Sequence, residues 1–367
     1  MKSKLILALA FGFAMQLMAQ TEGRSKVYFT SDITPAGLVK VYEALGVPAE
    51  GRVAVKISTG ESEKSHQLNP QLIADLVKKV NGTLVECNTA YPGNRSNTAA
   101  HRRAIAERGY DKIAPVDIMD AEYDIDIPVQ DTTYIKFDRV GKNLENYDFM
   151  INLAHFKGHA MGGFGGVIKN ASIGVASADG KAYIHSCGAS TNVRAAFQNK
   201  KGQDAFLESM AAAAQGVHNY MKGKVLYIDV MNNMSVDCDC DGDPDAPKLK
   251  DMGILASLDP VALDKACIDL VFTHNATPGD DNDPLIARVN RQHGTHILDY
   301  GEKIGFGSKG YELIDITDCT APEADKKGKR LYNVYGMDGG KVLSKADSLK
   351  DLVKGEYIVN GKAQKVK

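Results

Sequence analysis

The sequence carries almost no net charge and contains no basic stretch. Its 44 Lys and Arg residues are nearly balanced by 46 Asp and Glu residues, which gives a formal net charge of -2. Proteins that bind nucleic acids or anionic membranes usually do so through clustered positive charge. The composition therefore excludes nucleic acid as an expected partner and favours a small polar or anionic ligand.

The sequence also lacks a long apolar run beyond its N-terminus. Lys2 and Lys4 precede an apolar run at residues 5–18, which ends before Ala19 and is short for a membrane-spanning helix. This pattern is typical of a secretory signal peptide. We expect residues 1–19 to be removed, leaving an exported protein of the periplasm or cell surface without a transmembrane segment.

No ferredoxin-like run of cysteines is present. A cubane iron–sulfur cluster needs four thiolates, commonly from a C-x₂-C-x₂-C run, so we expect no ferredoxin-type cluster. In an oxidising compartment the cysteines can instead form disulfides. The six cysteines are Cys87, Cys187, Cys238, Cys240, Cys267 and Cys319.

Between residues 20 and 323, short apolar strands alternate with amphipathic helices. This order predicts parallel βαβ units and hence an α/β fold, with a doubly wound, mainly parallel sheet and flanking helices. With 44% hydrophobic residues, the chain can fill a sizeable core. The predicted strands are 52–57, 83–86, 113–118, 149–154 and 224–229, and the predicted helices lie near 70–80, 98–108, 202–221 and 260–271.

Unusual polar residues follow nearly every predicted strand. In an open α/β sheet the carboxyl ends of the strands form one edge where ligands bind, so these residues can converge on one site. Lysine and arginine suit a carboxylate or phosphate, and a nearby glutamate can act as a base. The alternative is that each polar residue caps a helix or makes a turn. The catalytic candidates are Lys56, Glu61 and Lys169, and the ligand-binding candidates are Asn88, Tyr91, Arg95, Asn97 and His101.

The acidic run at residues 237–245 alternates aspartate with cysteine and supports three interpretations. Cys238 and Cys240 can bind zinc or iron together with His155 and His159, because thiolate and imidazole are the usual ligands of both metals. The D-x-D-x-D-G order also opens an EF-hand-type calcium loop, although its twelfth position is a lysine rather than a glutamate. The calcium ligands would be Asp237, Asp239, Asp241 and Asp243.

The third interpretation is a solvated acidic loop whose cysteines form disulfides with Cys187 or Cys319. Thiolate binding uses both cysteines and both histidines, whereas the calcium loop lacks its bidentate ligand. We therefore expect zinc or iron as the cofactor before calcium.

Several separated motifs resemble the domain-of-unknown-function family numbered 362. They occur in order over roughly residues 26–318, and chance agreement of so many motifs would be rare. The resemblance implies an iron–sulfur association, because many members carry a ferredoxin insert. This chain departs from that pattern, with only Cys187 at the place of the insert and Ser58 where relatives tend to have histidine. The motifs are 53–56 with 60–61, 88–97 with His101, 155–159 with 163–170, 237–240 with 245–247, and 253–257 with 259–262.

Residues 324–367 differ in character from the rest of the chain. A charged segment is followed by short β-strand patterns at residues 331–336 and 355–362, with turn residues between them. Their order resembles a truncated form of the C-terminal sorting modules of Bacteroidetes, which implies a role in export or attachment. The alternative is a β-hairpin that packs on the main domain.

Taken together, the sequence predicts metal-dependent or redox chemistry on a small polar or anionic substrate, at a metal site formed by the strand C-termini. The competing interpretation is a non-catalytic periplasmic or surface binding protein that contains structural calcium or disulfides. Metal analysis combined with a thiol titration separates the two.

Overall fold

The computed structural model describes residues 24–195 and 200–317, together with the backbone of four strands between residues 332 and 366. The expected signal peptide, Cys319 and the charged segment at 324–329 lie outside the described residues.

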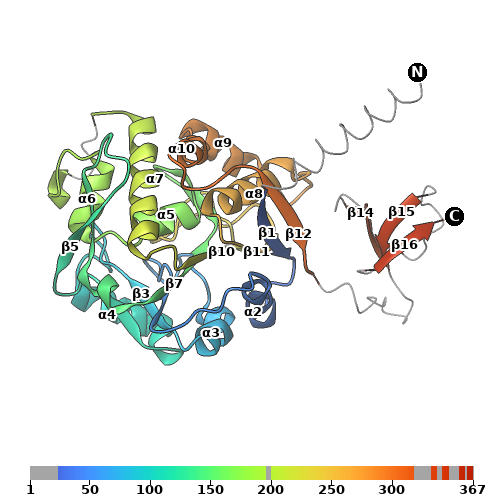
Figure 1. Cartoon of the computed structure of the whole chain (residues 1–367), viewed down its shortest axis with the longest axis horizontal. Helices are drawn as coiled ribbons and strands as arrows, with labels where there is room; N and C mark the ends of the chain where they lie inside the picture. Colours follow the sequence, from blue (N-terminus) through green and yellow to red (C-terminus); the bar gives the residue numbers. More distant parts are fainter. Residues whose placement is uncertain are drawn as a thin grey trace, which may run out of the picture.

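An eight-stranded sheet forms the centre of the described chain (Figure 1). Its strand order is β12-β1-β11-β10-β7-β2-β3-β4, and every pairing is parallel except the two that β11 makes with β1 and β10. The predicted α/β fold with a mainly parallel sheet is confirmed. The strands are β1 (Ser25–Thr30), β2 (Val53–Lys56), β3 (Thr83–Glu86), β4 (Val116–Ile118), β7 (Phe149–His155), β10 (Val225–Met231), β11 (Gly253–Ser257) and β12 (Tyr311–Asp315).

Helices cover both faces of this sheet, and each face has its own hydrophobic core. Helices α2, α3 and α4 share one core, and α5, α6, α7, α8, α9 and α10 share the other. The helices are α2 (Pro35–Ala44), α3 (Pro70–Lys79), α4 (Thr98–Arg108), α5 (Val167–Ser172), α6 (Ala178–His185), α7 (Gln203–Tyr220), α8 (Pro260–Thr273), α9 (Asp283–Arg291) and α10 (His296–Lys303), with single 3-10 turns at η1 (Tyr110–Lys112), η2 (Lys142–Asn146) and η3 (Val193–Ala195).

Local sequence explains where these elements begin and which way they face. Asn69 and Asp259 cap α3 and α8 with their side chains, each followed by a proline whose missing N–H costs nothing at a helix start. Along β2, Val53 and Val55 face the core of α2 and α3, whereas Ala54 faces the opposite core. This alternation is the period of two that a strand buried on both faces requires.

Two short hairpins interrupt the alternation of strands and helices. One consists of β5 (Asp124–Pro128) and β6 (Phe137–Gly141), and the other of β8 (Lys157–His159) and β9 (Gly163–Gly165). His155 ends β7 and His159 ends β8, so the pair does not lie on one turn of a helix. Although His155 and His159 are four residues apart, they lie at the ends of two strands and not on one face of a helix.

The tail contributes a separate four-stranded antiparallel sheet of order β14-β13-β15-β16. Two of its strands coincide with the predicted β-segments. The strands are β13 (Tyr332–Gly336), β14 (Lys341–Ala346), β15 (Gly355–Val359) and β16 (Lys362–Val366).

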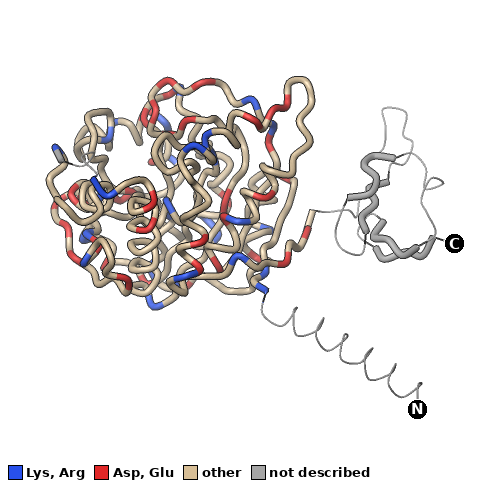
Figure 2. Tube along the Cα trace, turned by 90° about the horizontal axis from the view of Figure 1, so that it is seen from above, with Lys and Arg blue, Asp and Glu red and all other residues tan. Residues whose placement is uncertain are grey.

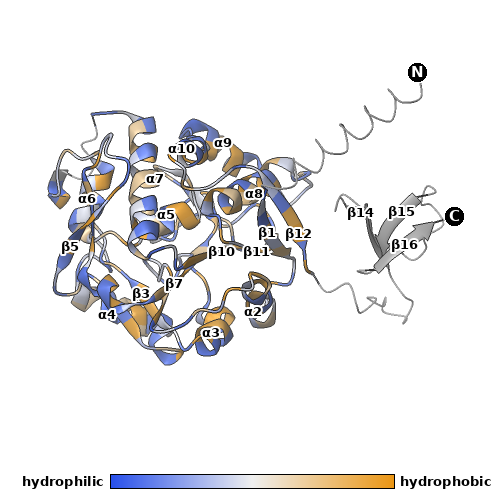
Figure 3. Ribbon diagram, viewed as in Figure 1, coloured by the Kyte–Doolittle hydropathy of each residue, from blue (hydrophilic) through white to orange (hydrophobic). Residues whose placement is uncertain are grey.

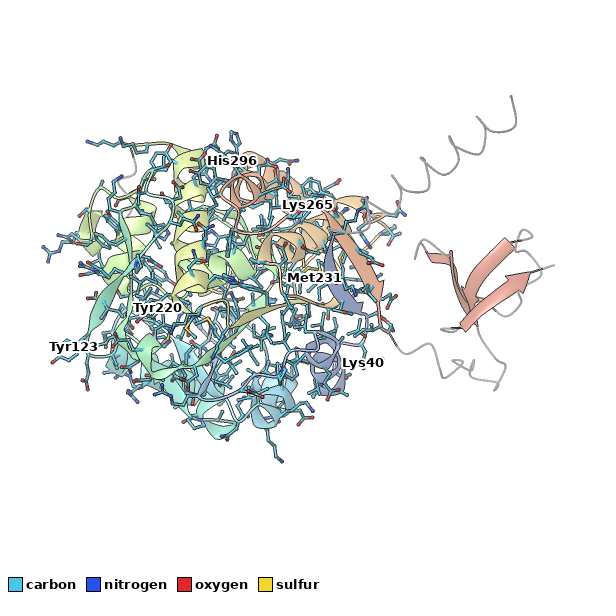
Figure 4. All side chains as sticks on the ribbon, in the orientation of Figure 1. Lys40, Tyr123, Tyr220, Met231, Lys265 and His296 are labelled. Atoms are coloured by element: carbon cyan, nitrogen blue, oxygen red, sulfur yellow. A yellow bond between two sulfur atoms is a disulfide. The ribbon has the colours of Figure 1, made fainter. Side chains whose placement is uncertain are left out.

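Charge and hydropathy are distributed as in a globular α/β domain. Lys, Arg, Asp and Glu are interspersed along the described trace (Figure 2), and hydrophobic and hydrophilic stretches share the same helices (Figure 3). Side chains fill the space between sheet and helices, and Tyr123, 68% exposed, lies at the periphery (Figure 4). Among the described helices, none has the length and apolar character needed to cross a membrane.

Candidate functional site

One cavity lies at the carboxyl ends of the central strands. It has a volume of about 280 Å³ and is lined by residues at or just after the ends of β2, β3 and β7, by the β8–β9 hairpin, by α5 and α6, and by the loop 238–240. This is the edge at which parallel sheets collect ligand-binding residues. Of the predicted site residues, those that line it are Lys56, Tyr91, Arg95, His155, His159, Lys169, Cys238, Asp239 and Cys240.

The charges that line this cavity are mostly positive. Its cationic side chains are Lys56, Arg95, Lys157, Lys169 and Lys181, whereas its acidic side chains are Glu86 and Asp239. A surplus of buried positive charge lowers the energy of a bound anion. The cavity is therefore suited to a small anionic ligand, although the protein as a whole is nearly neutral.

Arg95 is neutralised by two glutamates. Its Nε donates to Glu61 Oε2 at 3.2 Å and its Nη1 donates to Glu86 Oε1 at 2.7 Å, while Nη2 donates to the Tyr91 hydroxyl at 3.0 Å. Burial alone would raise the pKa of Glu86, but Arg95 and His101 together hold that pKa well below its usual range. Glu61 also accepts from the Asn94 backbone N–H. Neither Arg95 nor Glu61 is left with its charge uncompensated.

Three of the predicted ligand-binding residues have structural partners instead. His101 is fully buried, with Nε2 3.0 Å from Glu86 Oε2 and Nδ1 3.3 Å from Asn88 Oδ1. Asn97 accepts from the Ala100 N–H and caps α4. Asn88, Asn97 and His101 are not among the residues that line the cavity. Their role in the structure is to fix the segment that carries Tyr91 and Arg95.

Lys157 is ion-paired within the wall of the cavity. Its Nζ lies 2.9 Å from Asp239 Oδ2 and donates to the His155 carbonyl at 2.7 Å. Burial alone would raise the pKa of Asp239, but His155 and Lys157 hold it well below its usual range. Lys181, which sequence reasoning missed, donates to the Ala176 carbonyl at 2.6 Å. It could have been suspected from its place one turn before His185, since both face the cavity.

Lys56 and Lys169 approach the cavity differently. Lys56 Nζ donates to Asn170 Oδ1 at 3.0 Å and to the Ile57 carbonyl at 2.5 Å. The Lys169 ammonium makes no hydrogen bond or ion pair with the described residues. An added Cβ at Gly165 would lie 3.6 to 3.8 Å from Lys157 and Lys169, so both lysine side chains pass over this glycine.

The loop that carries the cysteines is held beside His159 by backbone contacts. The Gly158 N–H donates to the Ser235 carbonyl at 2.9 Å, and the Glu61 N–H donates to the Asp239 carbonyl at 2.8 Å. A Cβ at Gly158 would lie 2.1 Å from the Val236 carbonyl oxygen, so only glycine permits this approach.

His159, Cys238 and Cys240 could together hold a metal ion, because their ligand atoms all lie within 4.8 Å of one another. In the structure, however, Cys238 and Cys240 are joined by a disulfide. A disulfide sulfur is not a thiolate ligand, so metal binding requires the reduced pair. The predicted partners Cys187 and Cys319 are not used by these two cysteines.

His155 is separate from this group of three. Its Nδ1 lies 2.9 Å from Asp239 Oδ1 and its Nε2 lies 2.5 Å from the Asn232 carbonyl oxygen. Both ring nitrogens are thus occupied, and ligation through either would break one of these contacts. The structure therefore differs from the predicted four-ligand arrangement, because one of the two histidines positions Asp239 instead.

The aspartates of the acidic run do not converge on one point. Asp237 pairs with Arg288 at 2.7 Å, and Asp243 pairs with Lys64 at 2.9 Å. Asp239 faces Lys157, and Asp241 accepts from the Asp243 N–H. Because three of the four have their own cationic partners, the alternating run does not form the oxygen cage that calcium requires.

The fold and the cavity define an α/β protein with a cavity of mostly positive charge at the strand ends, beside a histidine and a cysteine pair. Residues 53–269, more than half of the chain, match the family described as Domain of unknown function (DUF362). The chain belongs to this family. Comparison with curated proteins gives no match.

Two solved structures are distantly similar. The lactate racemase apoprotein from Thermoanaerobacterium thermosaccharolyticum has 12% identity and a TM-score of 0.35, over 57% of this chain and 51% of its own. A protein from Thermotoga maritima has 13% identity and a TM-score of 0.38, over 65% of this chain and 58% of its own. The chain thus spans little more than half of each, and these similarities are too low to carry a function across.

Proposed function

We propose that this protein is an enzyme that binds a small organic anion in the cavity and acts on it beside His159, Cys238 and Cys240. The observation that carries the proposal is the meeting of surplus lysines and this group around one cavity. Enzymes place positive charge where a substrate anion must be held, and they place a reactive group beside that charge.

In the reduced state, the two thiolates and the His159 imidazole would supply three ligands for zinc or iron. Three protein ligands leave a fourth position for a substrate oxygen, and a metal bound there would polarise that group as a Lewis acid. The lysines of the cavity would hold the anionic end of the substrate. With six cysteines and no cluster-type run, we propose no cubane cluster.

A second candidate is dithiol–disulfide chemistry on the same cysteine pair, and the contacts of His159 favour it. Its Nδ1 accepts from the N–H groups of Met161 and Gly162, at 3.1 and 2.8 Å. Burial and then Lys169 lower the pKa of His159 well below its usual range, so the ring is neutral and its one proton lies on Nε2. That N–H faces Cys240 Sγ at 4.0 Å and would stabilise a thiolate.

Metal and thiol analysis under two redox conditions tests both candidates. Anaerobically reduced protein should bind about one zinc or iron per chain and show two more reactive thiols than oxidised protein. Cys238→Ser should abolish metal binding and His159→Ala should weaken it, whereas His296→Ala, which removes a histidine paired with Glu208, should leave it unchanged. Reversible thiol exposure without metal uptake would select the redox candidate. No change in either would reject both.

We also propose that the protein is exported, which rests on the charged start, the apolar run and Ala19. Mass spectrometry of protein secreted from an expressing cell should find a mature N-terminus near Gln20. An intact Met1 terminus on the exported protein would contradict this. Deleting residues 324–367 tests whether the tail directs surface attachment.

A further inference from the structure

Four lysines line the cavity, and their partners set one of them apart. Lys56, Lys157 and Lys181 each donate to a carbonyl oxygen, and Lys157 also pairs with a carboxylate. Lys169 has no such partner among the described residues, although it is only partly exposed and lines the cavity. A lysine that is largely withdrawn from solvent usually has a partner, whereas Lys169 faces the cavity without one among the described residues.

Asp264 holds the start of α5, the helix that carries Lys169. The N–H groups of Val167 and Ile168 donate to the two oxygens of Asp264 at 2.8 and 3.1 Å. A Cβ at Gly166 would lie 2.3 Å from Asp264 Oδ1, so glycine permits this close approach. Lys169 therefore extends from a helix whose start is held in place. A reactive group needs such a fixed position, because correct orientation lowers the reaction barrier.

The surroundings of Lys169 favour its neutral form. Burial and then the Lys157 ammonium lower the pKa of Lys169 to about 7, whereas burial lowers that of Lys56 only to about 8. An unprotonated lysine amine is a nucleophile toward carbonyl carbon, and desolvation beside another cation is the usual way to produce one.

We infer that Lys169 forms an imine with an organic anion that carries an aldehyde or ketone, such as a 2-oxo acid. This inference rests on the proposed function in that the lysines of the same cavity hold the carboxylate. It names both a nucleophile and a substrate class for the site.

The reaction balances without a further reactant. The Lys169 nitrogen attacks the carbonyl carbon, and the π electrons of the carbonyl move to its oxygen, giving a carbinolamine. That oxygen leaves as water with the two protons of the amine, and a C=N bond remains. Once a proton from water has protonated the imine nitrogen, the resulting iminium withdraws electrons from the substrate more strongly than the ketone, which eases loss of a neighbouring proton or carboxyl group.

Borohydride trapping tests the inference directly. The full chain is incubated near neutral pH with pyruvate, glyoxylate or 2-oxoglutarate, then reduced, and the modified lysine is located by peptide mass spectrometry. We expect a single adduct on Lys169, formed faster as the pH rises through about 7. Lys169→Arg should lose it, with an unchanged circular dichroism spectrum as the check on folding. Lys265→Met, which removes a lysine paired with Asp269 on α8, should retain it.

Calorimetric binding of malonate and inorganic phosphate separates this inference from the proposed function. If these anions and the oxo acids bind but no oxo acid is trapped on Lys169, the inference fails and the proposed function stands. Equal labelling of Lys56, Lys157 and Lys181 would also overturn the inference, because it would show no special reactivity. If no anion binds and Lys169 is not labelled, both fail.

Discussion

Two sets of charged residues meet at the cavity, and they are compensated to different degrees. In the first set, Arg95 is enclosed by Glu61 and Glu86, and His101 contacts Glu86 from the other side. In the second set, Lys157 pairs with Asp239, and the other three lysines form no ion pair among the described residues. The first set we call the paired set, and Lys56, Lys157, Lys169 and Lys181 we call the lysine set.

The difference in charge compensation distinguishes residues that support the cavity from residues that are available to a ligand. A buried charge with a full complement of partners holds neighbouring segments in place and has little left to offer a ligand. A buried charge without a partner costs free energy that a ligand of opposite sign can recover. The paired set therefore supports the shape of the cavity, and the lysine set leaves positive charge in the cavity wall, where we propose that the anion binds.

The largest expected effect comes from breaking the paired set. Arg95→Leu would leave Glu61 and Glu86 buried without their cation, which typically costs about 3–5 kcal/mol. Urea denaturation should show this loss in the free energy of unfolding. Arg139→Met removes a pair with Asp126 that is partly exposed, and should cost no more than about 1 kcal/mol. Equal losses in the two variants would remove the distinction between buried and exposed pairs.

A buried carboxyl should show a pH dependence of stability opposite in sign to that of Lys169, because burial raises the pKa of an acid and lowers that of a lysine. Asp138 in β6 is fully buried and forms no ion pair among the described residues, and burial raises its pKa to about 8 against the opposing effects of Lys181 and the Arg139 backbone. Between pH of about 4 and 8 the folded state keeps a proton that the unfolded state has lost, so stability falls as the pH rises, by at most about 1.4 kcal/mol per pH unit.

Asp138→Asn should therefore flatten the fall of melting temperature between pH 5 and 8 and stabilise the protein at pH 8. Asp126→Asn is the matched control on the same hairpin, because Asp126 pairs with Arg139 and is partly exposed. A slope that persists in Asp138→Asn would assign the titration to another group. The buried neighbouring carboxyls Asp229 and Asp264 come first, because burial raises the pKa of both.

Much of the fold could be predicted from the sequence, because hydrophobic period and helix caps are local signals. The strands ending at Lys56 and Glu86 and the helix beginning at Thr98 lie where their patterns place them. The antiparallel direction of β11 could not be predicted, since a strand buried on both faces shows the same apolar run in either direction.

The candidate site was less predictable, because partners are set by tertiary contacts. A position after a strand end indicates that Lys169 and Arg95 can reach the same edge, and the structure brings both to the cavity. Nothing in the sequence indicates that Arg95 would be enclosed by two glutamates while Lys169 would have no partner. Lys181 was missed because the short helix α6 has no clear amphipathic pattern.

A smaller effect is expected from the cysteine pair beside the two sets. A disulfide between Cys238 and Cys240 closes a loop of three residues, for which chain entropy gives about 1.6 kcal/mol of stabilisation. A bridge from Cys238 to Cys187 would close a loop of about 50 residues and give about 4 kcal/mol. Reduction of the wild-type protein should therefore lower the free energy of unfolding only slightly. A loss near the larger value would favour the long-range bridge and a structural role.

The smallest change in stability is expected for Lys169→Met. The substitution keeps most of the apolar stem and removes a charge that has no partner and is repelled by Lys157, so the free energy of unfolding should be unchanged or slightly higher. Lys56→Met is the matched control, because it leaves the Ile57 carbonyl and Asn170 Oδ1 without their donor and should cost about 1–3 kcal/mol.

The affinity of Lys169→Met for malonate should show whether Lys169 supports the fold or binds a ligand. At about pH 6, below the pKa of about 7 at which Lys169 loses its proton, loss of a charge-assisted contact in Lys169→Met should weaken malonate binding about tenfold, which corresponds to about 1.4 kcal/mol. The wild type should also gain stability between pH of about 7 and 10.4, because there the unfolded state binds a proton that folded Lys169 has released, and Lys169→Met should lose this slope. A variant that unfolds as easily as Lys56→Met, with unchanged affinity for malonate, would show that Lys169 supports the fold. Stability retained with affinity lost at about pH 6 would show that Lys169 serves a ligand rather than the fold.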